Sequence, residues 1–213
     1  MMDISILTSS IEHPVNAYLD KWAEKNKNHQ ISIVHSKKEL ISGDILFLIS
    51  CSDIISKLER GRFKKTLVVH ASDLPHGRGW SPHVWEIING ATDITLSLLE
   101  AEDKVDTGDI WKKISVPIPK TTLFDEINEL IFNSELKMLD FAIKNYNTIE
   151  SKRQPDIDME CWPKRFPKDS EIDINQTFFK QFNLMRVCDP QRFPAYFYID
   201  GVRFKITIEK YNE

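Results

Sequence analysis

The sequence predicts an α/β protein in which a mainly parallel sheet is covered by helices on both faces. The stretch DILFLIS (44–50) is a continuous apolar run, which is typical of a strand buried on both sides. Such runs alternate with stretches whose apolar residues recur at helical spacing, and this alternation favours parallel strands joined by helices. With 213 residues, 41% of them apolar, the chain can bury a core.

Six strands are expected in the first part of the chain. Each is a short apolar run of strand length, bounded by polar or turn-forming residues. The expected strands are 4–9, 30–36, 44–50, 66–72, 94–102 and 110–118.

Two helices are expected among these strands. Leu19 and Trp22 belong to an apolar set at helical spacing, with charged residues on the opposite side. Ser81 can cap a second helix, and Pro82 is tolerated in its first turn. The pair Asn89–Gly90 supplies the end of that helix.

A longer helix is expected after the last of these strands. Thr121 or Thr122 can cap it, and its apolar face continues to about Tyr146. Asp125 and Glu126 in its first turn suit the positive end of the helix dipole.

The character of the chain changes after about residue 151. We therefore expect a domain over 1–150 and a C-terminal extension over 151–213. Within the extension, 178–188 has the pattern of a short helix. The Asp-Gly pair within 195–208 lies between aromatic and aliphatic runs, and it predicts a β-hairpin.

Composition argues against several classes of protein. The net charge of −4 and the pI of about 5.9 argue against a protein whose main activity is binding nucleic acid. Three widely spaced cysteines without a CxxC pair indicate reduced thiols in a cytoplasmic protein and suggest no metal site. No signal peptide is expected at the N-terminus, and no run approaches the roughly 18 apolar residues of a membrane span.

The chemistry is expected where the strand 66–72 ends. His70 closes this strand, and Asp106 lies in the turn after a later one. Strand ends on one edge of an α/β sheet converge, so the two side chains can meet there. A histidine can move a proton near neutral pH, and a carboxylate can orient it and stabilise its cation. Gly108 is expected to give the turn unusual backbone angles.

The joint pattern resembles a known family. His-x-Ser-x-Leu-Pro, a basic glycine-containing loop, a helix and then Val-Asp-Thr-Gly-Asp resemble the folate-dependent formyltransferases over roughly 44–120. The segment 165–177, RFPKDSEIDINQT, extends the resemblance more loosely. The form of the two motifs looks closest to the sugar-nucleotide N-formyltransferases of the pseudaminic-acid pathway type.

The resemblance implies a Rossmann-like domain, 10-formyltetrahydrofolate as formyl donor and an amine as acceptor. It implies that His70 is the catalytic histidine and that Asp106 is its partner. The pterin would lie against backbone groups of two short segments. The residues implied for that contact are Ser52, Asp53, Ile54, Glu102, Asp103, Val105 and Asp106.

One position departs from the family pattern. The family carries Asn-x-His, with the asparagine helping to hold the formyl oxygen, and here that position is Val68. Losing one oxyanion donor typically costs about a hundred- to a thousandfold in rate. Either another group such as Ser72, His70 or a water supplies the donor, or activity is reduced or lost. Ser72 also has a plain structural interpretation, as the cap of its loop.

The amine acceptor is expected to be a nucleotide-linked amino sugar, such as a UDP-4-amino-4,6-dideoxy sugar used in bacterial surface-glycan synthesis. Arg78, or Lys164 with Arg165, can meet its diphosphate. The loop residues Gly79 and Trp80 would also contact it, and Trp80 is equally well interpreted as a packed residue. Further aromatic residues on which the base can stack are Trp162, Phe193 and Tyr196.

Two other functions stay open. One is a methionyl-tRNA formyltransferase-like enzyme, which would need a fuller second domain and basic surfaces. The other is a non-catalytic module that binds folate or a nucleotide sugar, with Val68 as the mark of lost activity. A homodimer formed through the hairpin is also expected to be possible.

Overall fold

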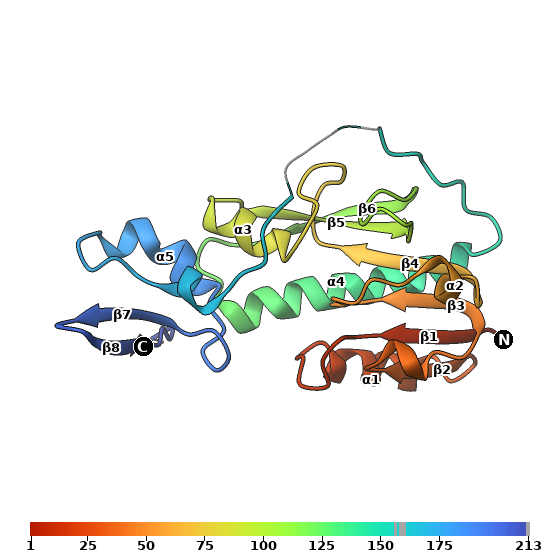
Figure 1. The fold of residues 1–213 in the computed structure, drawn as a ribbon, viewed down its shortest axis with the longest axis horizontal. Helices are drawn as coiled ribbons and strands as arrows, with labels where there is room; N and C mark the ends of the chain where they lie inside the picture. Colours follow the sequence, from red (N-terminus) through yellow and green to blue (C-terminus); the bar gives the residue numbers. More distant parts are fainter. Residues whose placement is uncertain (156, 158–160, 212–213) are drawn as a thin grey trace.

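A computed structural model describes residues 1–155, 157 and 161–211 of the chain. Its centre is a six-stranded sheet with the order β2-β1-β3-β4-β5-β6 (Figure 1). Strands β1 to β4 pair in parallel, whereas β5 is antiparallel to both of its neighbours. The strands are β1 (Asp3–Leu7), β2 (Gln30–Val34), β3 (Gly43–Leu48), β4 (Phe63–His70), β5 (Asp93–Glu100) and β6 (Ile110–Pro117). The predicted fold class, a mainly parallel Rossmann-like sheet, is confirmed.

Helices cover both faces of this sheet unequally. The 22-residue helix α4 packs with α1 on one face, and the short elements α2 and η1 lie on the other. The helical elements of this part are α1 (Asn16–Lys25), η1 (Lys37–Glu39), α2 (Lys57–Arg60), α3 (Pro82–Ile88) and α4 (Phe124–Asn145).

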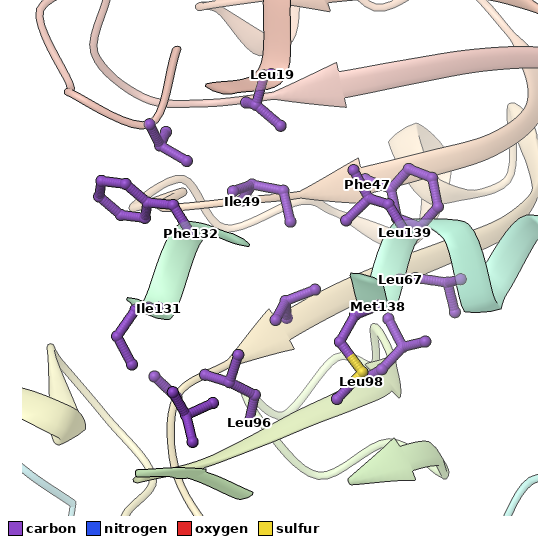
Figure 2. Close-up of a cluster of buried hydrophobic side chains, with 14 of the residues drawn as sticks. Leu19, Phe47, Ile49, Leu67, Leu96, Leu98, Ile131, Phe132, Met138 and Leu139 are labelled. Atoms are coloured by element: carbon purple, nitrogen blue, oxygen red, sulfur yellow. The ribbon is translucent and has the colours of Figure 1, made fainter. Parts of the chain in front are cut away.

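The main core lies between α4 and the sheet (Figure 2). Phe47 and Ile49 of the β3 segment point into it, where they join Met138 and Leu139 of α4. The alternate residue Leu48 points to the opposite face and packs in a second cluster. This period of two explains why the strand sequence is apolar throughout, since each of its two faces is covered.

Two predicted helix caps are wrong. Helix α4 begins after Leu123, whose N–H donates to the Glu126 carboxylate at 2.8 Å. The hydroxyl of Thr122 instead donates to the Pro119 carbonyl, so it shapes the preceding turn. Ser81 precedes α3 as expected, but it has a left-handed backbone (φ 45°) and its side chain caps nothing.

The C-terminal extension contains the predicted helix and hairpin. Its elements are η2 (Pro167–Ser170), α5 (Phe178–Arg186), β7 (Ala195–Ile199) and β8 (Val202–Ile206). β7 and β8 pair antiparallel, and Asp200 and Gly201 both have positive φ in the turn between them. This is the conformation that Asp-Gly favours in a two-residue hairpin loop.

A buried arginine ties the extension to the sheet domain. The Arg186 guanidinium of α5 donates to the Pro119 carbonyl at 3.0 Å and to Thr122 just before α4. Val187, the next residue, packs in the main core. The extension therefore shares buried contacts with the first part of the chain.

Among the helices that the structure describes, none combines the length and the apolar character that crossing a lipid bilayer requires.

Candidate active site

The site forms where β4 ends at His70. Side chains alternate along a strand, so His70 and Val68 point to the same face of the sheet. Val68 is half-buried there and packs against the second hydrophobic cluster, which includes Leu46 and Leu48. The position that holds an amide in the family pattern is thus an apolar contact in this chain.

His70 and Asp106 meet, although not for the reason that the sequence suggested. β5 runs antiparallel to β4, with Ser97 opposite His70 and Glu100 opposite Leu67. The end of β5 therefore lies beside the middle of β4, and the two strand ends do not share an edge. The turn 101–109 instead bends back along the sheet and carries the Asp106 carboxylate toward the imidazole.

The two side chains form a close, buried pair. The Nδ1 atom of His70 lies 3.5 Å from Oδ1 of Asp106, and each residue is only 8% exposed. The other ring nitrogen, Nε2, lies 3.0 Å from the carbonyl oxygen of Gly77. Both neighbours of the ring are acceptors, so only the imidazolium can donate to both at once. The two contacts therefore hold the imidazole in one orientation.

The loop after β4 closes around this pair through two glycines. Gly77 has φ 72°, and a Cβ there would lie 2.7 Å from the Ser72 Cβ. Gly79 has φ 106°, and its N–H donates to Oδ2 of Asp106 at 3.2 Å. The two carboxylate oxygens of Asp106 thus face different partners, the imidazole of His70 and the loop backbone.

Asp106 itself has an unusual backbone. Its φ is +58°, a left-handed conformation that costs a residue with a side chain of the order of 1 kcal/mol. The expectation that Gly108 supplies the unusual angles is wrong. Gly108 is required for space instead, because a Cβ there would lie 1.8 Å from the Glu100 carbonyl oxygen.

The two segments predicted to hold the pterin are joined by one arginine. Arg60 at the end of α2 donates to the Ile55 carbonyl at 2.7 Å and also to the carboxylate of Asp103. The apolar side chains of Ile54 and Val105 are 71% and 56% exposed, one on each segment. Free apolar side chains beside backbone polar groups are suited to a flat ring with polar edges.

The rest of these two segments is exposed or engaged locally. The Ser52 N–H donates to the Ser9 hydroxyl at 2.6 Å, so that donor is already used within the protein. Asp53 is half-exposed and Glu102 is exposed, and within the described residues neither carboxylate bonds to His70 or Asp106.

Of the residues predicted to contact the sugar nucleotide, Arg78 is buried, whereas Trp80 lies at the surface beside Lys164. The Arg78 guanidinium is buried, where it donates to Gln154 Oε1 at 3.3 Å, so it does not face solvent as a phosphate ligand would. Trp80 is 41% exposed, and the Lys164 ammonium lies 4.9 Å from its ring centroid. Arg165 lies over the Trp85 ring and donates to the Asp169 carbonyl.

Ser72 holds its own loop. Its hydroxyl donates to the His76 carbonyl at 2.9 Å, and its carbonyl accepts from the Ser97 hydroxyl at 2.7 Å. The side chain is fully buried. These contacts favour the structural interpretation of Ser72 over its role as an oxyanion donor.

Phe193 and Tyr196, two of the predicted stacking residues, line a separate cavity of about 430 Å³ near the hairpin. Arg203 lies 3.7 Å from the ring centroid of Tyr196, so one face of that ring is covered. The cavity is lined by Pro167, Arg192, Phe193, Pro194, Tyr196, Arg203 and Lys205.

Two titratable residues of α3 lie near the pair. The Glu86 carboxylate would lie 3.0 Å from a Cβ on Gly77, and burial, with the charge of Asp73, raises the Glu86 pKa to about 7. Burial lowers the His83 pKa to about 4, and a positive charge on His70 acts in the same direction. At neutral pH His83 therefore carries no charge, and Glu86 is partly protonated.

Sequence reasoning missed Gln154, Arg60 and Glu86. Gln154 lies in a polar stretch with no periodicity, and Arg60 belongs to a helix of only four residues. Glu86 sits between apolar helix positions, where a half-buried carboxylate is indistinguishable from an exposed one. Only the Ser-x-x-Glu capping box of α2 is a local signal, and it marks the helix start rather than Arg60. Within the described part of the chain, no cluster of His, Cys, Asp and Glu could hold a metal ion.

Comparison with known proteins connects this geometry to a family. The model of the formyl transferase family matches residues 5–143. A methionyl-tRNA formyltransferase of Lactobacillus johnsonii is 29% identical over 147 residues, which cover 65% of this chain and 44% of the relative. The chain thus spans less than half the length of that relative.

Solved structures share the fold. A methionyl-tRNA formyltransferase from Clostridium thermocellum has a TM-score of 0.84 at 22% identity, covering 100% of this chain and 94% of that one. A sugar N-formyltransferase from Shewanella sp has a TM-score of 0.74 at 15% identity, covering 100% and 99%. HypX from Aquifex aeolicus, solved with tetrahydrofolic acid, has a TM-score of 0.78 at 20% identity, covering 95% and 36%.

The match of the family model over 5–143 includes β4, the glycine loop and the turn of Asp106, which are the parts that build the buried His–Asp pair. The chain belongs to the formyl transferase family.

Proposed function

We propose that this chain transfers a formyl group from 10-formyltetrahydrofolate to the amine of a nucleotide-linked amino sugar. The observation that carries the formyl transfer is the buried pair of His70 and Asp106, 3.5 Å apart beside a glycine loop. Family membership supports the reaction class.

Formyl transfer requires two contributions from the protein, which are proton transfer and stabilisation of the oxyanion. The amine nitrogen attacks the formyl carbon and forms a C–N bond, which leaves an oxyanion on a tetrahedral carbon. Collapse breaks the bond to the folate nitrogen, and the proton lost by the amine is gained by that nitrogen. An imidazolium at His70, held by Asp106, can stabilise the oxyanion, and the neutral ring can accept the proton.

Val68 leaves the oxyanion with one donor fewer than the family pattern provides. Ser72 directs its hydroxyl to a loop carbonyl, so His70 Nε2 is the better-placed donor of the two. Its present partner is the Gly77 carbonyl, a neutral acceptor that an oxyanion can displace. A charged donor makes a stronger hydrogen bond than a neutral one, which offsets part of the lost amide.

The folate would bind over the segments that Arg60 joins. The exposed Ile54 and Val105 can pack against the two faces of a pterin, and the backbone of 102–105 can meet its polar edge. The tetrahydrofolic acid bound by the fold relative HypX supports this class of ligand.

A nucleotide-linked amino sugar is supported by the surface beside the loop. Trp80 is exposed under the Lys164 ammonium, which joins a stacking surface to a cation for a phosphate. The likeness of the whole chain to a sugar N-formyltransferase supports the same acceptor. We assign the sugar to the UDP-4-amino-4,6-dideoxy class of bacterial surface-glycan synthesis, of the pseudaminic-acid type, and the reaction to the cytoplasm.

The test is release of tetrahydrofolate when the protein is mixed with 10-formyltetrahydrofolate and a set of amino sugar nucleotides. Turnover is expected with a 4-amino sugar nucleotide, and His70→Ala and Asp106→Ala are expected to lower it by about 10²- to 10⁴-fold. Asp93→Asn is the matched control, because that carboxylate accepts from the Ser115 hydroxyl and lies outside the turn that carries Asp106.

Two results would replace this proposal. Formylation of charged initiator tRNA alone would establish the acceptor named for the Lactobacillus relative. Tight folate binding without turnover on any amine would show a binding module, in which Val68 marks the loss of catalysis.

A further inference from the structure

Gln154 is a buried amide at the start of the extension, and it contacts both the turn that carries Asp106 and the glycine loop. It is 7% exposed. Two residues before it, Lys152 exchanges backbone hydrogen bonds of 2.8 Å with Ile110, the first residue of β6. This bridge brings the chain back to the turn that carries Asp106.

The amide side chain uses its polar atoms on that turn and on the glycine loop. Its Nε2 donates to the carbonyl oxygens of Asp106 at 3.0 Å and of Gly108 at 2.8 Å. Its Oε1 accepts from the Arg78 guanidinium at 3.3 Å. Two carbonyls on one side and a cation on the other determine the orientation of the amide, since only the NH₂ can donate.

These contacts fall where the backbone needs support. Asp106 is held at φ +58°, and such a conformation persists only when the surroundings enforce it. Arg78 precedes Gly79, whose N–H donates to the Asp106 carboxylate. Gln154 therefore links the turn that carries the carboxylate to the loop that binds the carboxylate.

We propose that Gln154 is a positioning residue for formyl transfer, which acts by holding the Asp106 turn and the Arg78–Gly79 loop in one geometry. Within the described residues, its side chain bonds to Arg78, Asp106 and Gly108 and not to His70 itself. The inference rests on the proposed function, and it makes a residue outside the matched family region part of the catalytic apparatus.

The test compares Gln154→Met with Gln181→Met. Gln181 is a matched control, because its amide holds a turn in the same way, accepting from the Asp173 N–H at 2.7 Å and donating to the Asp173 carbonyl at 2.9 Å. Gln154→Met is expected to lower kcat by about 10- to 100-fold with the KM for folate nearly unchanged, since a shift of about 1 Å in a reacting group has this cost. Gln181→Met is expected to leave kcat unchanged.

A third variant separates the donor role from general packing. Gln154→Glu keeps an acceptor for Arg78 but places oxygen against two carbonyl oxygens, so it is expected to lose as much kcat as Gln154→Met. Wild-type kcat in Gln154→Glu, or an equal loss of kcat in Gln181→Met, would overturn the proposal.

Hydrogen exchange keeps the inference distinct from the proposed function. Amides of 103–110 and 76–80 are expected to exchange faster in Gln154→Met than in the wild type, and to be unchanged in Gln181→Met. If the wild type formylates no amine, the proposed function fails, but the hydrogen-exchange rates still test whether Gln154 holds the two segments. Unchanged exchange rates in Gln154→Met would show that Gln154 does not hold them.

Discussion

Buried polar side chains in this protein are satisfied to different degrees. Gln154 has hydrogen bonds for both ends of its amide, and Arg186 donates to the backbone before α4. Glu135 on the core side of α4 differs, because its Oε2 has no hydrogen-bond partner within the described part of the chain. Burial raises its pKa to about 8, so this side chain is neutral at physiological pH.

The protonated Glu135 makes stability depend on pH. An unfolded chain releases this proton above its ordinary pKa of about 4.5, whereas the folded protein keeps it up to about pH 8. Stability is therefore lost as pH rises through this window, by up to about 1.4 kcal/mol per pH unit. Glu135→Gln is expected to flatten the dependence in urea unfolding at pH 5, 6.5 and 8. Glu129→Gln, the same change at an exposed position of α4, should not.

At the scale of elements, the extension pairs with the glycine loop as an added strand would. The Trp162 N–H donates to the Arg78 carbonyl at 2.7 Å, and the Trp162 carbonyl accepts from the Trp80 N–H at 3.0 Å. Trp85 of α3 stacks on the Trp162 ring at 5.9 Å between centroids. Trp85 is thus one contact between α3 and the extension, in addition to the contact of α3 with α5.

Gly79 is the point at which this approach is closest. A Cβ there would lie 2.4 Å from the Trp162 carbonyl oxygen, whereas a Cβ on Gly90, at a similar φ of 98°, would meet nothing within 4 Å. Both Gly→Ala variants are expected to lose about 1 kcal/mol of stability from backbone strain. Only Gly79→Ala is expected to lose kcat as well, because the loop that binds Asp106 must move. Thermal unfolding measures the loss of stability, and turnover measures kcat. Equal kcat in the two variants would contradict the predicted role of Gly79.

Local signals predicted some of these elements well and others not at all. Apolar runs predicted β3 and β4, and the Asp200–Gly201 pair predicted the hairpin turn, because period and turn chemistry are properties of the local chain. The cap at Thr122 was wrong because a distant arginine and a local carbonyl take its hydroxyl. The contact of His70 with Asp106 was expected from converging strand ends and from the family resemblance, whereas the reversal of β5 that sets its geometry has no local signal. Gln154 depends entirely on tertiary contacts.

At the scale of the whole molecule, the hairpin lies apart from the sheet, at one end of the long axis (Figure 1). Its outer residues include Val202, which is 57% exposed, and Phe204, which is stacked on Phe197. β8 pairs only with β7 among the described strands, so its second edge offers free backbone groups. Such an edge suits pairing with another chain, and the homodimer stays a prediction.

A charge on this edge tests the dimer. Val202→Lys is expected to convert a dimer of twice 24.8 kDa into a monomer without changing the unfolding temperature of the sheet domain. Charged side chains are a common means of blocking pairing at exposed edges. Light scattering after gel filtration measures the mass, with Lys205→Ala as a control of opposite charge change. A wild-type monomer, or a variant that stays dimeric, would contradict the prediction.

Residues 152 and 162 pair with β6 and with the glycine loop, and this affects the order in which the site forms during synthesis of the chain. All six strands and α4 precede residue 146, yet Lys152, Gln154 and Trp162 make contacts with the loops of the site. A growing polypeptide that already contains its complete sheet still lacks the groups that secure Asp106 and Gly79. The site is therefore completed in a late step, when Lys152, Gln154 and Trp162 dock on a sheet that has been translated before them.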